Sequence, residues 1–432
     1  MKLLLLFLFV SVSLWAGDIE KALSAPQAKI PDGQTQIHWR DKLDDAFKEA
    51  KSSNRPLFVT FRCLPCKQCA SFDKDVLEGG PVLSPLLKQF ITVRLTDASQ
   101  LNTAIFPFEQ YQDLDLSWWG YFLSPQGQIY GVFGGKDHVS DQTRISVEAI
   151  KNTMKRVLNY HYQPQRKAWN LDGPEPKPET GKFPKDYPMY NDWKNERPWV
   201  GKQTCLHCHQ VNDIVRYEPV MTGKFNKETD LDMWPLPENA GINLERDHGL
   251  KVVSSSNTDK AQHKLQKGDE IVAAGDKLTF SQADFRGVLH RFKDQGKLPV
   301  WIKRNGQVYK TLIVLKKDWR QPFKREHLYW RKSVYDGPIG AYQGFWPLKG
   351  PKSGKGSMSI KPWFGKDTSK NIAYQAGMRP HHVIIAVDGK SPDLFGRNFV
   401  GWFKLNYKKG DKVTFTVLEK GKKKQISYQL KK

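Results

Sequence analysis

The chain carries the sequence Cys63-Leu64-Pro65-Cys66 directly after a short apolar segment, Leu57–Phe61. An apolar run of this length beside turn-forming residues is typical of a buried β-strand. We expect a helix to begin at the cysteines, where the positive end of the backbone dipole lowers the pKa of a thiol. The second cysteine can then attack a mixed disulfide. The pattern therefore favours folds in which a strand leads into a helix that carries two reactive thiols.

The residues around this motif alternate between helical and strand patterns. Apolar residues at helical spacing predict one helix near Leu43–Ala50 and another near Ile150–Leu158. Further strands are predicted at residues 90–95, 118–123 and 128–133. The last two flank Ser124-Pro125-Gln126-Gly127, which is a turn signal. This order predicts an α/β sandwich over residues 34–162.

The N-terminus has one lysine followed by an apolar run, and small residues occur at Ala16-Gly17. This is the pattern of a secretory signal peptide at residues 1–17. We therefore expect an exported protein of the periplasm or cell envelope, either soluble or associated with a membrane.

The net charge limits the classes of binding partner that we expect for this chain. The net charge is +23, and residues 349–432 hold 19 Lys and Arg against 5 Asp and Glu. No groove-reading helix or single-strand platform accompanies this charge, so nucleic acid is not an expected partner. A membrane surface or an anionic envelope polymer is a natural partner for such a basic protein, and a merely solvated basic face is the plain alternative.

The second half of the chain divides into four predicted parts. Prolines interrupt residues 163–202, which are expected to form a semi-rigid linker. A short segment with a second cysteine motif occupies residues 203–237. Two β-rich passages follow at residues 238–317 and 338–432, and they share a skeleton: Lys267–Lys277 corresponds to Arg379–Lys390. This indicates an imperfect internal duplication.

The central motif is Cys205-Leu206-His207-Cys208-His209. Its spacing is that of haem c attachment, in which Cys205 and Cys208 form thioethers and His209 ligates the iron. This pentapeptide resembles the attachment site of c-type cytochromes. A zinc site using the same cysteines with histidines is a second possibility, and a disulfide or a pair of thiols is a third.

The first domain resembles the thioredoxin-like family, in which an aromatic residue precedes Cys-x-Pro-Cys-Lys. The resemblance implies that Cys63 is the attacking thiol and Cys66 the resolving thiol. Two features depart from the family pattern: the stretch Asp115–Trp119 lacks the family's cis-proline, and Cys69 adds a third thiol. Cys63, Cys66 and Cys69 together offer a soft site for Cu(I) or zinc as an alternative.

The two β-rich passages resemble PDZ domains of the bacterial envelope type. In the first passage, the peptide-binding loop is expected at Gly241, Ile242, Asn243 and Leu244. Such a loop binds a C-terminal carboxylate while the peptide adds a strand to the sheet. In the second passage, His381-His382 replaces the Gly-Asp of the first, which makes peptide binding less expected there. A packing module without a peptide ligand is the alternative for both.

The whole arrangement resembles a group of exported bacterial thioredoxin-like/PDZ proteins, some of which contain selenocysteine. We therefore expect a multi-domain α/β plus β-rich chain: a thioredoxin-like sandwich followed by two PDZ-like domains. The expected function is thiol–disulfide exchange or electron transfer, with the PDZ-like domains binding envelope proteins or peptides. The alternative is a non-catalytic scaffold or a metal-binding or metal-transfer protein of the cell envelope.

Overall fold

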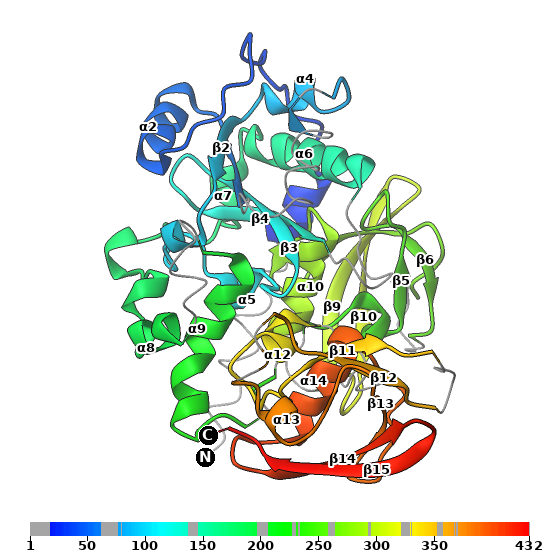
Figure 1. Ribbon diagram of the computed structural model, residues 1–432. Helices are drawn as coiled ribbons and strands as arrows, with labels where there is room; N and C mark the ends of the chain where they lie inside the picture. Colours follow the sequence, from blue (N-terminus) through cyan, green and yellow to red (C-terminus); the bar gives the residue numbers. More distant parts are fainter. Residues whose placement is uncertain are drawn as a thin grey trace, which may run out of the picture. The chain divides into compact units, whose positions relative to one another are not determined.

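The structure is a computed structural model (Figure 1). It describes residues 18–61, 77–78, 80–136, 146–196, 206–226, 230–231, 234–257, 264–292, 295–320, 329, 331–351, 357–366, 368 and 370–431. The chain divides into two compact units. Unit 1 is Met1–Val211 with Met233–Gln321, and unit 2 is Asn212–Asp232 with Pro322–Lys432. Within the described ranges, no helix has both the length and the apolar character needed to cross a membrane.

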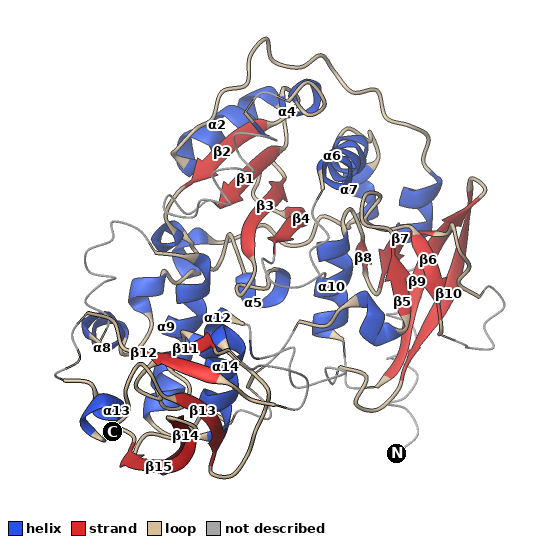
Figure 2. Cartoon of the chain, turned by 45° about the vertical axis from the view of Figure 1, so that its right-hand side comes forward, coloured by secondary structure: helices blue, strands red, loops and turns tan. Residues whose placement is uncertain are grey.

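Unit 1 begins with a mixed four-stranded sheet whose strand order is β2-β1-β3-β4 (Figure 2). β1 pairs with β2 in parallel, and β3 runs antiparallel to both β1 and β4. The strands are β1 (Leu57–Phe61), β2 (Ile91–Leu95), β3 (Ser117–Leu123) and β4 (Ile129–Lys136). The helices around them are α2 (Leu43–Ser53), α4 (Ser84–Leu87), η2 (Ala98–Gln100), α5 (Phe108–Tyr111) and α6 (Val147–His161). These elements confirm the α/β pattern predicted from the sequence.

The core of this domain forms where aromatic side chains of the strands meet the apolar side of α6. The rings of Phe58 and Phe122 are stacked with centroids 4.9 Å apart, because these residues are cross-strand partners in β1 and β3. Met154 and Val157 of α6 are buried in the same cluster. The helix begins at Ser146, whose hydroxyl accepts a hydrogen bond from the Ala149 N–H at 3.1 Å.

The proline-rich segment contains more regular structure than a linker requires. It forms α7 (Arg166–Trp169), η3 (Pro178–Thr180), η4 (Pro184–Asp186) and α8 (Tyr190–Asn195). Trp169 and Trp193 are both buried. The prolines stand at the beginning of the 3-10 helices, where the missing N–H costs nothing. Buried aromatic side chains therefore attach this segment to the rest of the protein.

The first β-rich passage forms module 1, which we define as residues 237–315 and which belongs to unit 1. Its elements are η5 (Pro237–Ala240), β5 (Ile242–Leu244), β6 (Val252–Ser255), β7 (Glu270–Ala274), β8 (Lys277–Leu278), α10 (Gln282–Arg291), β9 (Gly296–Arg304) and β10 (Gln307–Leu315). β5 and β6 form a two-stranded sheet, and the other strands form a sheet of order β10-β9-β7-β8.

The second passage forms module 2, defined as residues 346–429 of unit 2. Its elements are β11 (Trp346–Lys349), β12 (Ile360–Trp363), α13 (Ile372–Gln375), β13 (Val383–Val387), α14 (Gly396–Asn406), β14 (Lys412–Glu419) and β15 (Lys422–Gln429), and α12 (Lys332–Tyr335) precedes them. The strands form one sheet of order β11-β12-β13-β14-β15. Both modules place a strand, then a long helix, then a hairpin in the same order.

Candidate functional site

The candidate site lies at one end of the β2-β1-β3-β4 sheet. Because β1 and β2 are parallel, their last residues, Phe61 and Leu95, lie at the same end. β3 begins at that end, since Trp119 is the partner of Phe61. The predicted thiols Cys63, Cys66 and Cys69 follow Phe61 in the sequence and lie outside the described residues.

The backbone at the start of β3 is strained. Trp118 has a φ of 59°, a left-handed conformation that bulky residues avoid. Its carbonyl oxygen faces Gly134 of β4, where an added Cβ would lie 2.4 Å from that oxygen. Strain of this kind tends to occur at functional sites, where the surrounding structure holds it in place. It occurs here in the stretch where the thioredoxin-like family places its cis-proline.

The central cysteine motif reaches the same end of the sheet. The Leu206 N–H donates to the Asp97 carboxylate at 2.7 Å, and the Leu206 carbonyl accepts from the Ala98 N–H at 3.1 Å. Asp97 follows β2 by two residues. α9 (Cys208–Met221) begins immediately after this contact. Cys208 and His209 are therefore described by the structure, whereas Cys205 lies outside the described residues.

Cys208 lies close to β3 as well. Tyr121 of β3 is completely buried, and burial raises the pKa of its hydroxyl well above the ordinary value. The nearby Cys208 raises the pKa of Tyr121 further, because a thiolate and a phenolate would repel each other. The Tyr121 side chain and the Gln112 side-chain oxygen are hydrogen-bonded at 2.9 Å. Tyr121 thus stays a neutral donor beside Cys208.

The surroundings of Cys208 bear on the haem prediction. A thioether to haem requires a sulfur that faces a space as wide as the porphyrin. Cys208 is 7% exposed, and Leu206 and Val211 next to it are also buried. The His207 and His209 rings lie 5.5 Å apart. Cys208 is a buried thiol in the structure; haem c, zinc and a disulfide with Cys205 stay predictions.

Module 1 packs against the open edge of the thioredoxin-like sheet. The Asp284 carboxylate of α10 accepts a hydrogen bond from the Val132 N–H of β4 at 2.7 Å, and the Ser281 hydroxyl donates to the Val132 carbonyl. The same carboxylate accepts from the N–H groups of Phe280 and Ser281, each at 3.0 Å. An edge strand exposes unpaired backbone groups, and the beginning of α10 satisfies those of Val132.

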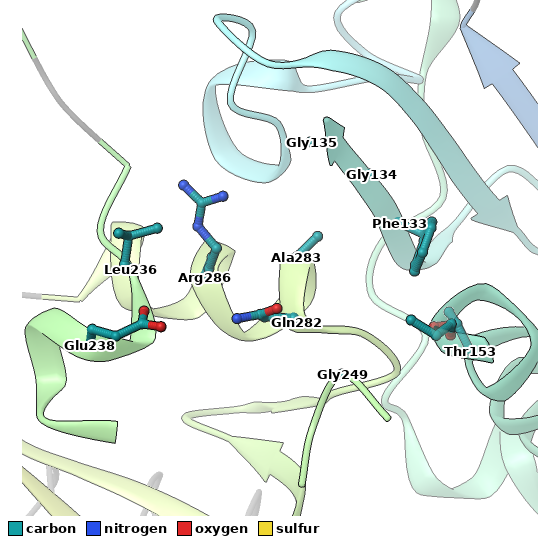
Figure 3. Close-up of a pocket in the computed structure, with 11 residues that line it drawn as sticks. Phe133, Gly134, Gly135, Thr153, Leu236, Glu238, Gly249, Gln282, Ala283 and Arg286 are labelled. Atoms are coloured by element: carbon teal, nitrogen blue, oxygen red, sulfur yellow. Dashed lines mark hydrogen bonds between the residues drawn. The ribbon is translucent and has the colours of Figure 1, made fainter. Parts of the chain in front are cut away.

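A small cavity lies beside this contact and is too small for a substrate. Figure 3 shows Gln282, Ala283 and Arg286 of α10 around it, together with the end of β4 at Phe133–Gly135. Its volume is about 20 Å³, and about 10–15 Å³ is enough to hold one water molecule. Gln282 is 6% exposed, and its side-chain oxygen has no partner among the residues that the structure describes. One water molecule would satisfy it.

A buried ion pair joins α10 to the loop that precedes β3. Arg286 donates to the Asp113 carboxylate at 3.3 Å, and it also donates to the backbone oxygens of Trp234 and Pro235. The Asp113 side chain is 1% exposed. Arg156 of α6 makes a second ion pair, at 2.8 Å, with Glu270 of module 1. Module 1 is therefore fixed to the domain that leads into the cysteines.

The buried Asp284 predicts a pH dependence. Burial raises the pKa of Asp284 from 3.8 to about 6, although three backbone N–H groups and Lys277 favour the ionised form. The folded state thus prefers the protonated acid, so this contribution to stability is present below pH 4 and is lost as the pH rises through 6. We expect the free energy of unfolding of the wild type, relative to Asp284→Asn, to fall by about 2–3 kcal/mol across this window. Urea titrations of both proteins between pH 4 and 7 measure these free energies of unfolding. A difference between the two proteins that does not change with pH would show that the pKa of Asp284 is not raised.

Two residues of the predicted peptide-binding loop of module 1 are buried in the core of that module. Gly241 has a φ of 73°, and Ile242 and Leu244 point into the core while Asn243 is exposed. Every residue from Gln282 to Leu289 of α10 is buried. α10 is therefore covered over most of its length. These contacts favour the alternative of a packing module for module 1.

Module 2 has an open edge strand, but a proline interrupts its hydrogen-bonding groups. β11 is the edge of its sheet, and Pro347 is paired with Pro362 of β12. The Gly350 N–H donates a hydrogen bond to the Ser359 carbonyl oxygen at 3.0 Å. Because hydrogen-bonded and non-hydrogen-bonded pairs alternate along an antiparallel hairpin, Pro347 and Pro362 form a non-hydrogen-bonded pair. The Pro347 nitrogen therefore faces the open edge of the sheet. A peptide added to this edge would find no donor at Pro347.

Among the described residues, one group of side chains has the composition of a metal site: His381, His382 and Glu419. Nδ1 of His382 accepts a hydrogen bond from the Arg379 N–H at 3.2 Å, and Nε2 lies 3.0 Å from the Glu419 carboxylate. The ring proton therefore belongs on Nε2, and both nitrogens are engaged. His382 is completely buried. This group supports the fold by holding β13 and β14 together.

Comparisons with known proteins agree with the geometry of the first domain. A family model described as thioredoxin-like matches residues 38–114, which include α2, β1, β2 and α5. No curated protein matches the chain. The N-terminal part of the chain therefore contains a thioredoxin-like domain.

Proposed function

We propose that this chain is an exported thiol–disulfide redox protein that uses Cys63 and Cys66. The observation that carries the proposal is the thioredoxin-like domain, whose β1 ends at Phe61, two residues before Cys63. The strained Trp118 and the buried Cys208 at the same end of the sheet support a functional site there. The N-terminal apolar run supports export.

The proposed reaction is two-step thiol exchange. The Cys63 thiolate attacks one sulfur of a substrate disulfide, forming a mixed disulfide and releasing the other substrate sulfur as a thiolate. The Cys66 thiolate then attacks the Cys63 sulfur and releases the second substrate sulfur. The substrate disulfide is reduced to a dithiol, two protons are taken from solvent, and Cys63 and Cys66 become a disulfide. The same steps in reverse oxidise a substrate.

The two modules have different roles in this proposal. Module 1 is a fixed support of the thioredoxin-like domain, because α10 covers the β4 edge and Arg286 pairs with Asp113. Docking of envelope proteins or peptides is then left to module 2, although His381-His382 stands there in place of the Gly-Asp of the first passage. Its hairpin edge at Pro347 favours docking through side chains over full strand addition.

A trapping experiment tests the redox role. In Cys66→Ser the mixed disulfide cannot be resolved, so the full chain should accumulate covalently bound to a disulfide-containing peptide. Cys69→Ser is the matched control and should turn over without accumulation. Non-reducing gels and mass spectrometry identify the adduct. Failure of Cys66→Ser to trap any substrate, together with one zinc or copper ion per chain in the wild type, would replace this proposal by the metal-binding alternative.

A second experiment addresses the central motif. If the motif serves thiol chemistry, Cys205 and Cys208 should be recovered as thiols or as a disulfide from a host that has haem-attachment machinery. The product should be colourless, and two additional thiols should react with an alkylating agent after reduction and denaturation. A Soret band and haem staining on a denaturing gel, both lost in Cys205→Ala with Cys208→Ala, would establish haem c in place of the thiols.

A further inference from the structure

Unit 2 contains a cavity of about 610 Å³. It lies between the last turn of α9, the loop Pro338–Gly340 and the end of α14. The volume is within the range of about 300–1,000 Å³ that is usual for small-molecule sites. All of its lining residues belong to unit 2 and are described by the structure. It lies outside the thioredoxin-like domain.

The lining combines apolar side chains with lysines. The apolar residues are Val220, Met221, Phe225, Ile339, Leu405 and Tyr407. The lysines are Lys224, Lys404, Lys408 and Lys409. None of the residues that the structure places in the lining is acidic. Met221 is 40% exposed and contributes apolar surface to the lining.

The lysines differ in whether their ammonium groups already have hydrogen-bond or ion-pair partners within the fold. Nζ of Lys404 donates to the backbone oxygens of Tyr335 and Gly337, so its ammonium group is held in position. Lys224, Lys408 and Lys409 are exposed and form no ion pair with any residue in the described part of the chain. Their positive charge is therefore available to a ligand.

Two carboxylates that contact lining residues already have hydrogen-bond partners within the fold. Asp388 accepts hydrogen bonds from the Tyr407 hydroxyl at 2.9 Å and from the Thr414 N–H at 2.8 Å. Asp411 accepts from the Lys408 N–H at 2.7 Å. Both carboxylates have partners within the fold, and neither lines the cavity. A negatively charged ligand would therefore meet lysines at the cavity and no acidic lining residue.

We propose that this cavity binds a single-chain amphiphile with an anionic head group, of the fatty acid or alkyl phosphate class. The alkyl chain would pack against Val220, Ile339 and Leu405, and the head group would lie near Lys408 and Lys409. An extended peptide fits less well, because no β-strand contributes to the lining and an added strand would have no ladder to join. This inference does not depend on the cysteines.

Calorimetric titration of the full chain tests the proposal, with dodecanoate and dodecyl phosphate used below their micelle concentrations. Both should bind, whereas inorganic phosphate and dodecanol should each bind at least tenfold more weakly. Lys408→Glu with Lys409→Glu should weaken dodecyl phosphate binding at least tenfold. The matched control is Lys422→Glu with Lys423→Glu, which makes the same change of charge on exposed residues of β15 in the same unit. It should change the affinity less than twofold.

A second variant tests the apolar part of the site. Val220→Trp should fill the cavity and abolish binding of both amphiphiles, while circular dichroism shows that the protein remains folded. Equal binding of inorganic phosphate and dodecyl phosphate would overturn the proposal in favour of a simple anion site. An equal loss in the two lysine variants would indicate diffuse charge attraction. Binding only to anionic phospholipid vesicles, with no binding of monomeric dodecanoate, would indicate a membrane surface contact.

Discussion

Cys63→Ser is expected to abolish thiol–disulfide exchange by the full chain. A serine hydroxyl does not ionise near neutral pH and cannot form a mixed disulfide, so the first step of the proposed reaction is lost completely. Exchange is measured as reduction of a disulfide-bonded peptide by the prereduced protein. The measurement is made in a Cys205→Ser, Cys208→Ser background so that only the first cysteine cluster contributes.

Alkylation separates a reactive Cys63 from an ordinary thiol. A thiol at a helix N-terminus with a pKa near 7 instead of about 8.5 has on the order of tenfold more thiolate at neutral pH. Cys63 should therefore be labelled faster than Cys69, and Cys69→Ser should leave exchange intact. Equal labelling rates, with exchange undiminished in Cys63→Ser, would contradict the assignment of Cys63 as the attacking thiol.

Asp113→Ala is expected to destabilise unit 1 by about 3–5 kcal/mol, because it leaves the buried Arg286 guanidinium without its carboxylate. The free energy of unfolding is measured by urea titration at pH 7. Asp45→Ala is the matched control, since Asp45 makes an exposed ion pair with Lys48 on α2. The control should cost less than about 1 kcal/mol.

A double variant distinguishes the unpaired charge from a general loss of packing. Asp113→Leu with Arg286→Met removes both charges and should recover most of the stability that Asp113→Ala loses, because an apolar pair can replace a buried ion pair at little cost. A double variant as unstable as the single one would show that the hydrogen bonds of Arg286 to Trp234 and Pro235 matter more than the ion pair.

The sequence predicts the local elements of the first domain well and the contacts between distant segments poorly. The strand before Cys63, the hairpin around Ser124–Gly127 and the closing helix follow from short-range patterns, and the structure contains all of them. The pair of Asp113 with Arg286 joins residues 173 positions apart, and no local pattern indicates it. Similarly, the spacing of the two cysteines in the central motif does not indicate that Cys208 is buried next to Tyr121 of β3.

One local signal for the module 1 contact is present in the sequence. Ser281 and Asp284 have the spacing of a capping box, and each side chain accepts a hydrogen bond from the other's backbone N–H. This pattern predicts where α10 begins. It does not predict that Asp284 also binds Val132 of β4, because a capping box is usually complete within its own helix.

Because α10 covers the edge of β4, it determines which fragments of this protein can fold without exposing that edge. A fragment that ends after α8 would contain the whole thioredoxin-like sheet but not Ser281 or Asp284, so the backbone groups of Val132 would be left without these partners. Such an edge is a template for pairing with another chain. The two repeats are consequently not interchangeable: module 1 completes the folding unit of the thioredoxin-like domain, and a shorter protein with one repeat would need to retain the first.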